Sequence, residues 1–458
     1  MFVCNILQNY QESAYLCRMN HKDILSKKVL ENLKFGSWNA IQSAMISNEL
    51  KANNIVLLAP TGSGKTVAFL LPLLYHLRTN IAGVQALILT PSRELSLQIE
   101  QVFRSMGTGF KVNCCYGGHP VKTERNNFVE PPAVLIGTPG RIAAHFRRCS
   151  FNAEMIHFLV LDEFDKSLEM GFSEEMSYII SNLPEIKWRI LTSATQAIEI
   201  PEFAGVKNPV TLNFLTDENR PNIVIKGVRA KDNDKLETLI QLICHLGNEP
   251  TLVFCNHREA VDRISGQLYS DGVVHDIFHG GLGQEERERA LLKFRNGSHN
   301  ILVTTDLASR GLDIPETKNI IHYQGVNTEE AFIHRNGRTA RMNTHGTAWL
   351  VLAEKEPIPG FLNTQPVFID LKRENKIPAQ PQWITLYIGA GRKDKISKGD
   401  IVGFLIGKGN LQSKEIGLIT ILDNASYVAV LRSKAYDILN LIKDEKIKNK
   451  KVRIDISS

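Results

Sequence analysis

Residues 55–77 read IVLLAPTGSGKTVAFLLPLLYHL, and this stretch decides the fold. It begins as an unbroken apolar run, which is typical of a strand buried on both faces of a parallel sheet. A glycine-containing loop and an apolar helix-like segment follow. Gly62 and Gly64 allow a tight turn that aims backbone N–H groups at phosphate oxygens, and the helix N-terminus adds a favourable dipole.

This loop is therefore predicted to bind the phosphates of ATP. Lys65 would reach the β- and γ-phosphates, and the Thr66 hydroxyl would ligate Mg²⁺. Ala59 stands where the usual pattern has glycine. The expected ATP-binding residues here are Ala59, Pro60, Thr61, Gly62, Ser63, Gly64, Lys65 and Thr66.

Similar apolar runs recur along the chain and predict parallel strands. The first series also includes residues 86–91, 133–139, 158–163 and 189–195, and a second series lies at 251–256, 300–306 and 319–324. Amphipathic stretches separate them; at 93–106, Leu95, Ile99, Val102, Phe103 and Met106 share one helical face. This alternation predicts two doubly wound α/β domains. The polar stretch 216–234 is expected to be a linker, with a second break at 372–382.

Two acids end one of these runs, FLVLDE at residues 158–163. Side chains at the carboxyl ends of strands lie in the crevice where open α/β sheets bind ligands. We expect Asp162 to hold Mg²⁺ and Glu163 to orient and polarise the attacking water. A pair of solvated acids is the alternative, which the neighbouring phosphate loop disfavours.

The second series has no GKT sequence, so one chain is expected to bind one ATP. It does contain HRNGRTAR at residues 334–341. Its arginines are Arg335, Arg338 and Arg341, and residues three apart share a helix face or a turn. If they face the nucleotide they can stabilise charge on the transferred phosphoryl group. A basic surface helix is the alternative.

Composition excludes several protein classes. With 43% hydrophobic and 22% charged residues, the 458-residue chain is neither disordered nor fibrous. The seven scattered cysteines form no CxxC pair, which favours a reducing compartment without disulfides. No apolar stretch has the 18 residues of a membrane span, and a cytoplasmic location is expected. From Trp383 onward, 14 Lys+Arg face 8 Asp+Glu, which equals the net +6 of the whole chain and predicts a polyanion-binding tail.

Taken in order, these strings resemble those of DEAD-box RNA helicases of superfamily two, over about residues 23–370. The matching strings are Gln42 in SWNAIQ, APTGSGKT, PSREL (91–95), Gly117–Gly118, TPGR (138–141), DEFD (162–165), SAT (193–195), VFCN (253–256), QEER (284–287), TTDLASRGLD (304–313) and HRNGRTAR. The resemblance implies two tandem RecA-like domains with ATP and Mg²⁺ between them. Residues 383–458 resemble the RRM-like RNA-binding domain of bacterial DbpA helicases, a small α+β fold.

The resemblance also implies roles for individual residues. Gln42 reads the adenine edge, Gly311 and Asp313 lie near the nucleotide, and Arg338 and Arg341 act as arginine fingers. Coupling of hydrolysis to domain closure falls to Asp165, Ser193, Thr195, His334 and Arg335. The implied RNA-binding residues are Arg93, Gly118, Thr138, Arg141, Gln284, Arg287 and Thr305, joined by Tyr387 and Tyr427 in the tail domain.

Several positions depart from the family pattern. Trp38–Asn39 replaces the proline-threonine before the adenine glutamine, and the upstream adenine-stacking aromatic falls near Cys17, with Tyr15 two residues away. Phe164 replaces an alanine, and Ala340 replaces a glycine. The tail keeps two tyrosines but has Ala425 and Val430 where an RRM has further aromatics.

We expect RecA-like domains over residues 19–212 and 213–372, a linker at 373–382 and the RNA-binding domain at 383–458. Residues 1–18 are an extension outside the match, so Met19 is a candidate start. The expected function is ATP-dependent opening of short RNA duplexes, with a structured hairpin of large-subunit ribosomal RNA as target. Two alternatives remain at this point: an RNA clamp that does not unwind, and a DNA-directed translocase.

Overall fold

The computed structural model describes residues 21–48, 52–118, 124, 126–195, 199–215, 223–231, 234–308, 314–315, 317–339, 346–362, 364–371 and 376–457. The chain divides into two compact units, residues 1–220 and 221–458.

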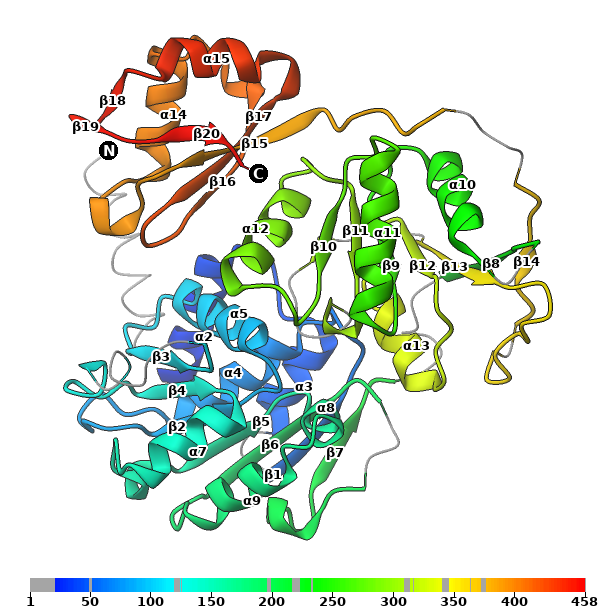
Figure 1. Ribbon diagram of the computed structural model, residues 1–458. Coiled ribbons are helices and arrows are strands. Elements are labelled where there is room, and N and C mark those ends of the chain that lie inside the picture. The colour runs from blue at the N-terminus through cyan, green and yellow to red at the C-terminus, as the bar shows by residue number, and fades with distance from the viewer. Residues whose placement is uncertain are drawn as a thin grey trace, which may run out of the picture. The chain divides into compact units, whose positions relative to one another are not determined.

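The first unit is built on a parallel seven-stranded sheet in the order β3-β4-β2-β5-β6-β1-β7 (Figure 1). Its strands are β1 (Asn54–Leu58), β2 (Ala86–Leu89), β3 (Val112–Cys115), β4 (Val134–Gly137), β5 (Phe158–Leu161), β6 (Trp188–Ser193) and β7 (Val210–Asn213). Its helices are α2 (His21–Leu33), α3 (Ala40–Asn48), α4 (Lys65–His76), α5 (Arg93–Ser105), α7 (Pro139–Arg147), α8 (Phe164–Glu169) and α9 (Ser173–Ser181).

Both faces of this sheet are buried, which explains the apolar runs without alternation. Ile55 and Leu57 belong to one core with α3, α4 and α5, whereas Val56 and Leu58 belong to a second core with α7, α8 and α9. Successive side chains of β1 thus enter opposite layers. All five apolar runs predicted in this half form strands.

The second unit begins with another parallel seven-stranded sheet, in the order β10-β11-β9-β12-β13-β8-β14. Its strands are β8 (Ile223–Arg229), β9 (Thr251–Phe254), β10 (Asp276–Phe278), β11 (Ile301–Thr304), β12 (Asn319–His322), β13 (Gly346–Leu352) and β14 (Val367–Phe368). Helices α10 (Leu236–Leu246), α11 (Arg258–Ser270), α12 (Gln284–Arg295) and α13 (Glu329–Asn336) supply apolar side chains to its cores. The linker interpretation was wrong for Ile223–Arg229, which forms β8 rather than a loop.

The tail forms a four-stranded antiparallel sheet in the order β16-β17-β15-β20, with two helices. Its elements are β15 (Trp383–Ile388), α14 (Lys398–Gly407), β16 (Ile416–Ile421), β17 (Ser426–Leu431), α15 (Ala435–Ile442) and β20 (Ile454–Ile456). A short hairpin joins β18 (Lys446–Ile447) to β19 (Lys450–Lys451). One apolar core unites both helices with the sheet, as the predicted RRM-like fold requires.

Candidate nucleotide and RNA sites

The phosphate loop has the backbone that its glycines predict. Gly62 and Gly64 have φ of 80° and 88°, the left-handed region that other residues rarely adopt. A Cβ on Gly64 would lie 2.8 Å from Gln42 Nε2, so a side chain there would displace the Gln42 amide. Lys65 begins α4, and its Nζ donates to the carbonyl of Ala59 at 2.6 Å. The loop backbone and the start of α4 therefore have the form that the phosphate-loop motif predicts.

Gln42 is held against this loop by Asn39, one of the residues that depart from the family pattern. The Asn39 backbone N–H donates to Gln42 Oε1 at 3.0 Å, and Asn39 Oδ1 accepts from Gln42 N–H at 2.9 Å. Asn39 Nδ2 also donates to the carbonyl of Ser63 at 3.0 Å. Asn39 thus caps α3 and joins it to the phosphate loop, a role that the sequence did not reveal. Cys17 and Tyr15 lie outside the described residues.

The acids Asp162 and Glu163 follow β5 directly and are buried, with 3% and 5% of their surfaces exposed. Thr192 on the adjacent strand β6 links them: its hydroxyl donates to Asp162 Oδ1 and accepts the backbone N–H of Glu163 at 3.1 Å. Burial raises the pKa of Asp162, while the Thr192 hydroxyl and Lys65 act to lower it. A buried carboxylate facing a lysine next to a phosphate loop fits a divalent cation, and the donor pair would be Thr66 and Asp162. Sequence reasoning missed Thr192.

The predicted coupling residues of the first unit also meet. Thr195 Oγ1 donates to Asp165 Oδ2 at 3.2 Å, and Ser193 Oγ accepts the backbone N–H of Thr195 at 2.9 Å. The carbonyl of Ser193 accepts the N–H of Ala59 at 3.1 Å. One continuous set of contacts therefore runs from the phosphate loop through Ser193 to Asp165. Phe164 is buried in the core with α7 and α9, and it leaves all three acids in place.

The four predicted RNA-binding residues of the first unit gather around Tyr116, which sequence reasoning did not identify. The Arg93 guanidinium lies 4.3 Å from the centre of the Tyr116 ring, and Arg141 Nε donates to the Tyr116 carbonyl at 3.0 Å. Gly118 has φ of 105°, and a Cβ there would lie 3.5 Å from Arg93 Nη1. Thr138 caps α7, and its N–H reaches the carbonyl of Cys115 at 3.2 Å.

In the second unit, Arg335 is fully buried and organises the ends of three strands. It makes a bidentate pair with Asp306, at 2.6 and 3.0 Å, and donates to Asn256 Oδ1 at 2.8 Å and to the Gln324 carbonyl at 3.1 Å. His334, which precedes Arg335, and Arg338, three residues after it, are also buried. Gly311, Asp313, Ala340 and Arg341 lie outside the described residues.

The remaining predicted RNA-binding residues belong to two places. Gln284 begins α12 and accepts from Arg287 Nη2 at 2.5 Å, whereas Thr305 follows β11. In the tail, Tyr387 and Tyr427 are direct cross-strand partners whose ring centres lie 5.6 Å apart. Tyr427 is buried and Tyr387 is half-buried, so Tyr387 offers the more accessible ring.

Among the described residues, no helix is both long and apolar enough to cross a membrane.

Comparison with known proteins identifies three family matches along the chain. Residues 39–203 match the DEAD/DEAH box helicase family, 234–343 the helicase conserved C-terminal domain, and 385–456 the DbpA RNA binding domain. The ATP-dependent RNA helicase DbpA of Bacillus subtilis is 29% identical over 94% of this chain and 97% of its own length. Its namesake in Escherichia coli is 30% identical over 93% of this chain and 95% of the relative.

Among solved structures, Saccharomyces cerevisiae Dbp5 bound to RNA and ADP BeF3 aligns with a TM-score of 0.66 and 28% identity, over 74% of this chain and 89% of that one. These matches confirm two RecA-like domains and an RRM-like tail. Lys65, Asp162 and Glu163, which were predicted to be catalytic, and Ser193 and Thr195, which were predicted to couple hydrolysis to closure, are all buried. The chain therefore belongs to the DEAD-box family of ATP-dependent RNA helicases and ends in a DbpA-type RNA-binding domain.

Proposed function

We propose that this helicase opens short RNA duplexes locally, through ATP-driven closure of its two RecA-like domains, and that it acts in large-subunit ribosome assembly. We propose domain limits of 19–212, 213–372 and 383–458. The continuous contacts from the phosphate loop through Ser193 and Thr195 to Asp165 carry the first part, because they give nucleotide chemistry a route to the RNA face.

In this proposal the first domain supplies most of the chemistry. Lys65 binds the β- and γ-phosphates, Gln42 orients the adenine, and Glu163 orients the attacking water. Mg²⁺ held by Thr66 and Asp162 would neutralise charge on the phosphates. Arg338 and Arg341 contribute from the second domain, with Gly311 and Asp313 near the nucleotide and with His334 and Arg335 supporting that wall.

Closure follows from differential binding. The nucleotide gains the arginine contacts only when both domains face it, and a ligand with equal affinity for the two states would shift nothing. The closed form grips one strand through Arg93, Gly118, Thr138 and Arg141 on one domain and through Gln284, Arg287 and Thr305 on the other. A strand held bent in this way cannot remain in a regular helix, so the adjoining base pairs open.

The tail domain would hold the motor near its target and raise the local concentration of RNA. The match of residues 385–456 to the DbpA RNA binding domain and the positive charge of the tail support this role. Tyr387 and Tyr427 would stack on bases. A structured hairpin of large-subunit ribosomal RNA is the proposed target, and crosslinking in cells followed by sequencing of the recovered RNA tests it.

A strand-displacement assay tests the motor itself. The chain is mixed with a short labelled RNA duplex carrying a single-stranded extension, with and without ATP. Release of the labelled strand in ATP, and its loss in Lys65→Ala, are expected. RNA-stimulated ATPase without strand release would instead favour a clamp, and equal stimulation by DNA would favour a DNA-directed translocase.

A further inference from the structure

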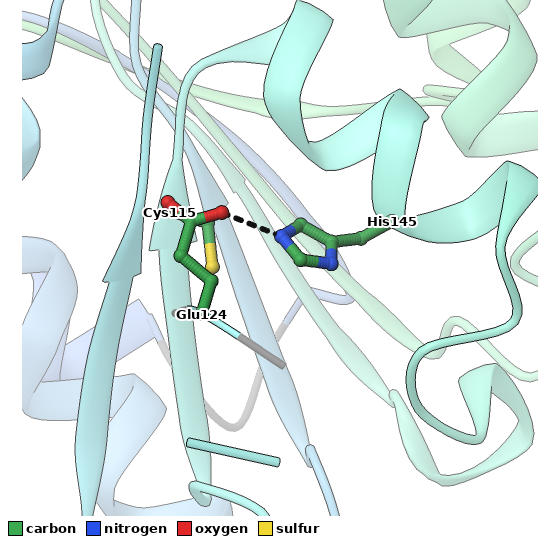
Figure 2. A group of neighbouring side chains, drawn as sticks. All are labelled: Cys115, Glu124 and His145. Atoms are coloured by element: carbon green, nitrogen blue, oxygen red, sulfur yellow. Dashed lines mark hydrogen bonds and ion pairs between the residues drawn. The ribbon is translucent and has the colours of Figure 1, made fainter. Parts of the chain in front are cut away.

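A buried polar cluster lies in the first domain, where the end of β3 approaches helix α7 (Figure 2). It consists of Cys115, Glu124 and His145, each at most 2% exposed. His145 Nε2 lies 2.7 Å from Glu124 Oε2, and His145 Nδ1 lies 3.0 Å from the hydroxyl of Ser150. The motifs that define the ATP and RNA sites do not include Glu124 or His145.

The carboxylate of Glu124 bridges the helix and the loop that carries the RNA-binding residues. Its Oε1 accepts the backbone N–H of Tyr116 at 3.2 Å, and its Oε2 lies 3.6 Å from Arg141 Nε. Arg141 in turn donates to the carbonyl of Tyr116. Glu124 and Arg141 therefore hold both the N–H and the C=O of one residue, which fixes the direction of that peptide segment.

The three side chains offer donor atoms within 4.8 Å of one another, which raises the question of a metal site. The contacts favour an ion pair. Glu124 already faces His145 and Arg141, and a divalent cation would have to be accommodated next to the arginine's charge. Burial raises the pKa of the Cys115 thiol far above its usual range, with Glu124 adding to the effect, so the thiolate that a metal prefers is disfavoured.

Tyr116 connects this cluster to the surface that we assign to RNA. Its ring supports the Arg93 guanidinium, and it immediately precedes Gly117–Gly118. Arg141 lies in the first turn of α7, three residues after Thr138. A shift of the Tyr116 segment would therefore displace Arg93, Gly118 and Arg141 together.

We propose that Glu124 is a positioning residue for the RNA grip of the first domain. By bridging His145 and Arg141 while accepting from Tyr116, it holds the arginines in the geometry that meets successive phosphates of a single strand. This inference rests on the proposed function, because it assigns Glu124 a role in the RNA contacts proposed there. It adds a carboxylate that never touches RNA yet determines how tightly RNA binds.

The test uses the full chain and Glu124→Gln, which keeps the size of the side chain and an acceptor for Tyr116 but removes the charge. RNA-stimulated ATPase is measured against single-stranded RNA at several salt concentrations. We expect the RNA concentration for half-maximal stimulation to rise about tenfold. The slope of log affinity against log salt should flatten by about 0.7, the value of one lost phosphate contact. Glu154→Gln, an exposed acid of the same domain, serves as the matched control.

A double-mutant cycle separates positioning from a general loss of folding. Because Glu124 acts partly through Arg141, Glu124→Gln should weaken RNA binding less in an Arg141→Gln background than in the unaltered chain. Additive losses, an unchanged salt slope, or RNA affinity equal to that of the unaltered chain would overturn the inference. Thermal unfolding of each variant checks the fold, and a loss of RNA affinity explained wholly by unfolding would also overturn it.

Two further outcomes are distinguishable. One zinc ion retained per chain and lost in Cys115→Ser would show a metal site and refute the ion-pair account. If the unaltered chain showed no RNA stimulation at all, the proposed function would fail. If the unaltered chain responds to RNA and Glu124→Gln responds identically, only the present inference fails.

Discussion

At the scale of single residues, the ATP site stores strain where chemistry is expected. Glu163 has φ of 46°, in the left-handed region, and residues in such positions cost on the order of 1–3 kcal/mol. The Thr192 hydroxyl, which accepts the Glu163 N–H, helps to hold this conformation. Glu163 is the residue that immediately precedes α8, so its left-handed backbone lies at the turn from β5 into the helix.

The first prediction concerns this acid. Glu163→Gln keeps the side-chain shape and removes the base, so ATP and RNA should still bind while turnover falls by about 10²–10⁴-fold. The RNA complex formed with ATP should persist, because closure no longer ends in hydrolysis. Stopped-flow phosphate release and filter binding measure the two effects, and ordinary turnover in this variant would refute the assigned role.

The second prediction concerns pH and His322 in β12. Burial, together with the nearby Arg335, lowers the pKa of His322 to about 3, from 6.5 in an exposed histidine. The native state keeps the ring neutral, whereas the unfolded chain takes up a proton below about pH 6.5. The titration of His322 therefore leaves the free energy of unfolding of this domain unchanged above about pH 6.5. It lowers that free energy as the pH falls towards 3, by up to about 1.4 kcal/mol per pH unit.

Hydrogen exchange at the amides of β12 and β13, corrected for the intrinsic rate, measures this loss. His322→Gln retains a donor for Asn336 Oδ1, which His322 Nε2 contacts at 3.0 Å, and does not titrate. Its stability should change less between pH 7 and pH 5 than that of the unaltered chain. Equal changes in both proteins would contradict the assignment.

At the scale of elements, strand ends position almost every functional side chain. Strand β6 is the clearest case, because it carries Thr192 towards Asp162 and ends at Ser193, with Thr195 two residues further facing Asp165. The hydroxyls of Thr192 and Thr195 therefore contact different acids, Asp162 after β5 and Asp165 in α8.

The third prediction uses this arrangement as a matched pair. Thr195→Val removes the donor to Asp165 with little change in shape, and we expect strand displacement to fall at least tenfold more than RNA-stimulated ATPase. Thr192→Val removes the donor to Asp162, and there ATPase and displacement should fall together. Parallel assays of the two activities decide the matter, and identical profiles for the two variants would remove the distinction between catalysis and coupling.

Most of the fold could be predicted from the sequence because central strands of a parallel sheet are buried on both faces. The apolar runs at β1, β2, β4, β5 and β6 all form strands, but β3 and β7 gave no comparable signal. These two lie at the sheet edges, where burial alternates or is partial, so their residues can be polar. The linker expectation also missed β8, which lies between β13 and β14 rather than at an edge, because most of its residues are only partly buried or exposed.

The candidate site was predictable only where one short string holds the chemistry. Lys65, Asp162 and Glu163 follow from their own motifs. Tyr116 and Thr192 act through contacts with residues far away in the chain, and Asn39 contacts Gln42 three residues on as well as Ser63 in the phosphate loop. An asparagine, a tyrosine or a threonine carries no signal of such contacts by itself. Asn39 even occupies a position where the family pattern has another residue, yet its amide joins α3 to the phosphate loop.

At the scale of the whole molecule, the excess positive charge and the predicted catalytic residues lie in different parts of the chain. Residues before Trp383 carry no net charge, and the tail carries the full excess of +6. Contacts made by basic residues to phosphates release counterions, so they strengthen binding without reading sequence. RNA binding by the two RecA-like domains and RNA binding by the tail should therefore depend differently on salt concentration.

The fourth prediction follows from this division. Removal of residues 383–458 should weaken RNA affinity, flatten its salt dependence and abolish preference among structured RNAs, while ATPase without RNA persists. Fluorescence anisotropy over a range of salt, with a hairpin and an unstructured strand, measures these changes. An RNA profile identical to that of the full chain would discredit the tether.

We propose that nucleotide and RNA bind cooperatively, because both would favour the same closed arrangement of the two domains. The most direct measurement is the affinity of the full chain for single-stranded RNA with a non-hydrolysable ATP analogue and with ADP, in parallel with Lys65→Ala. The account predicts at least about fivefold tighter RNA binding with the analogue, and loss of that difference in the variant. Equal RNA affinity in both nucleotide states of the unaltered chain would contradict it.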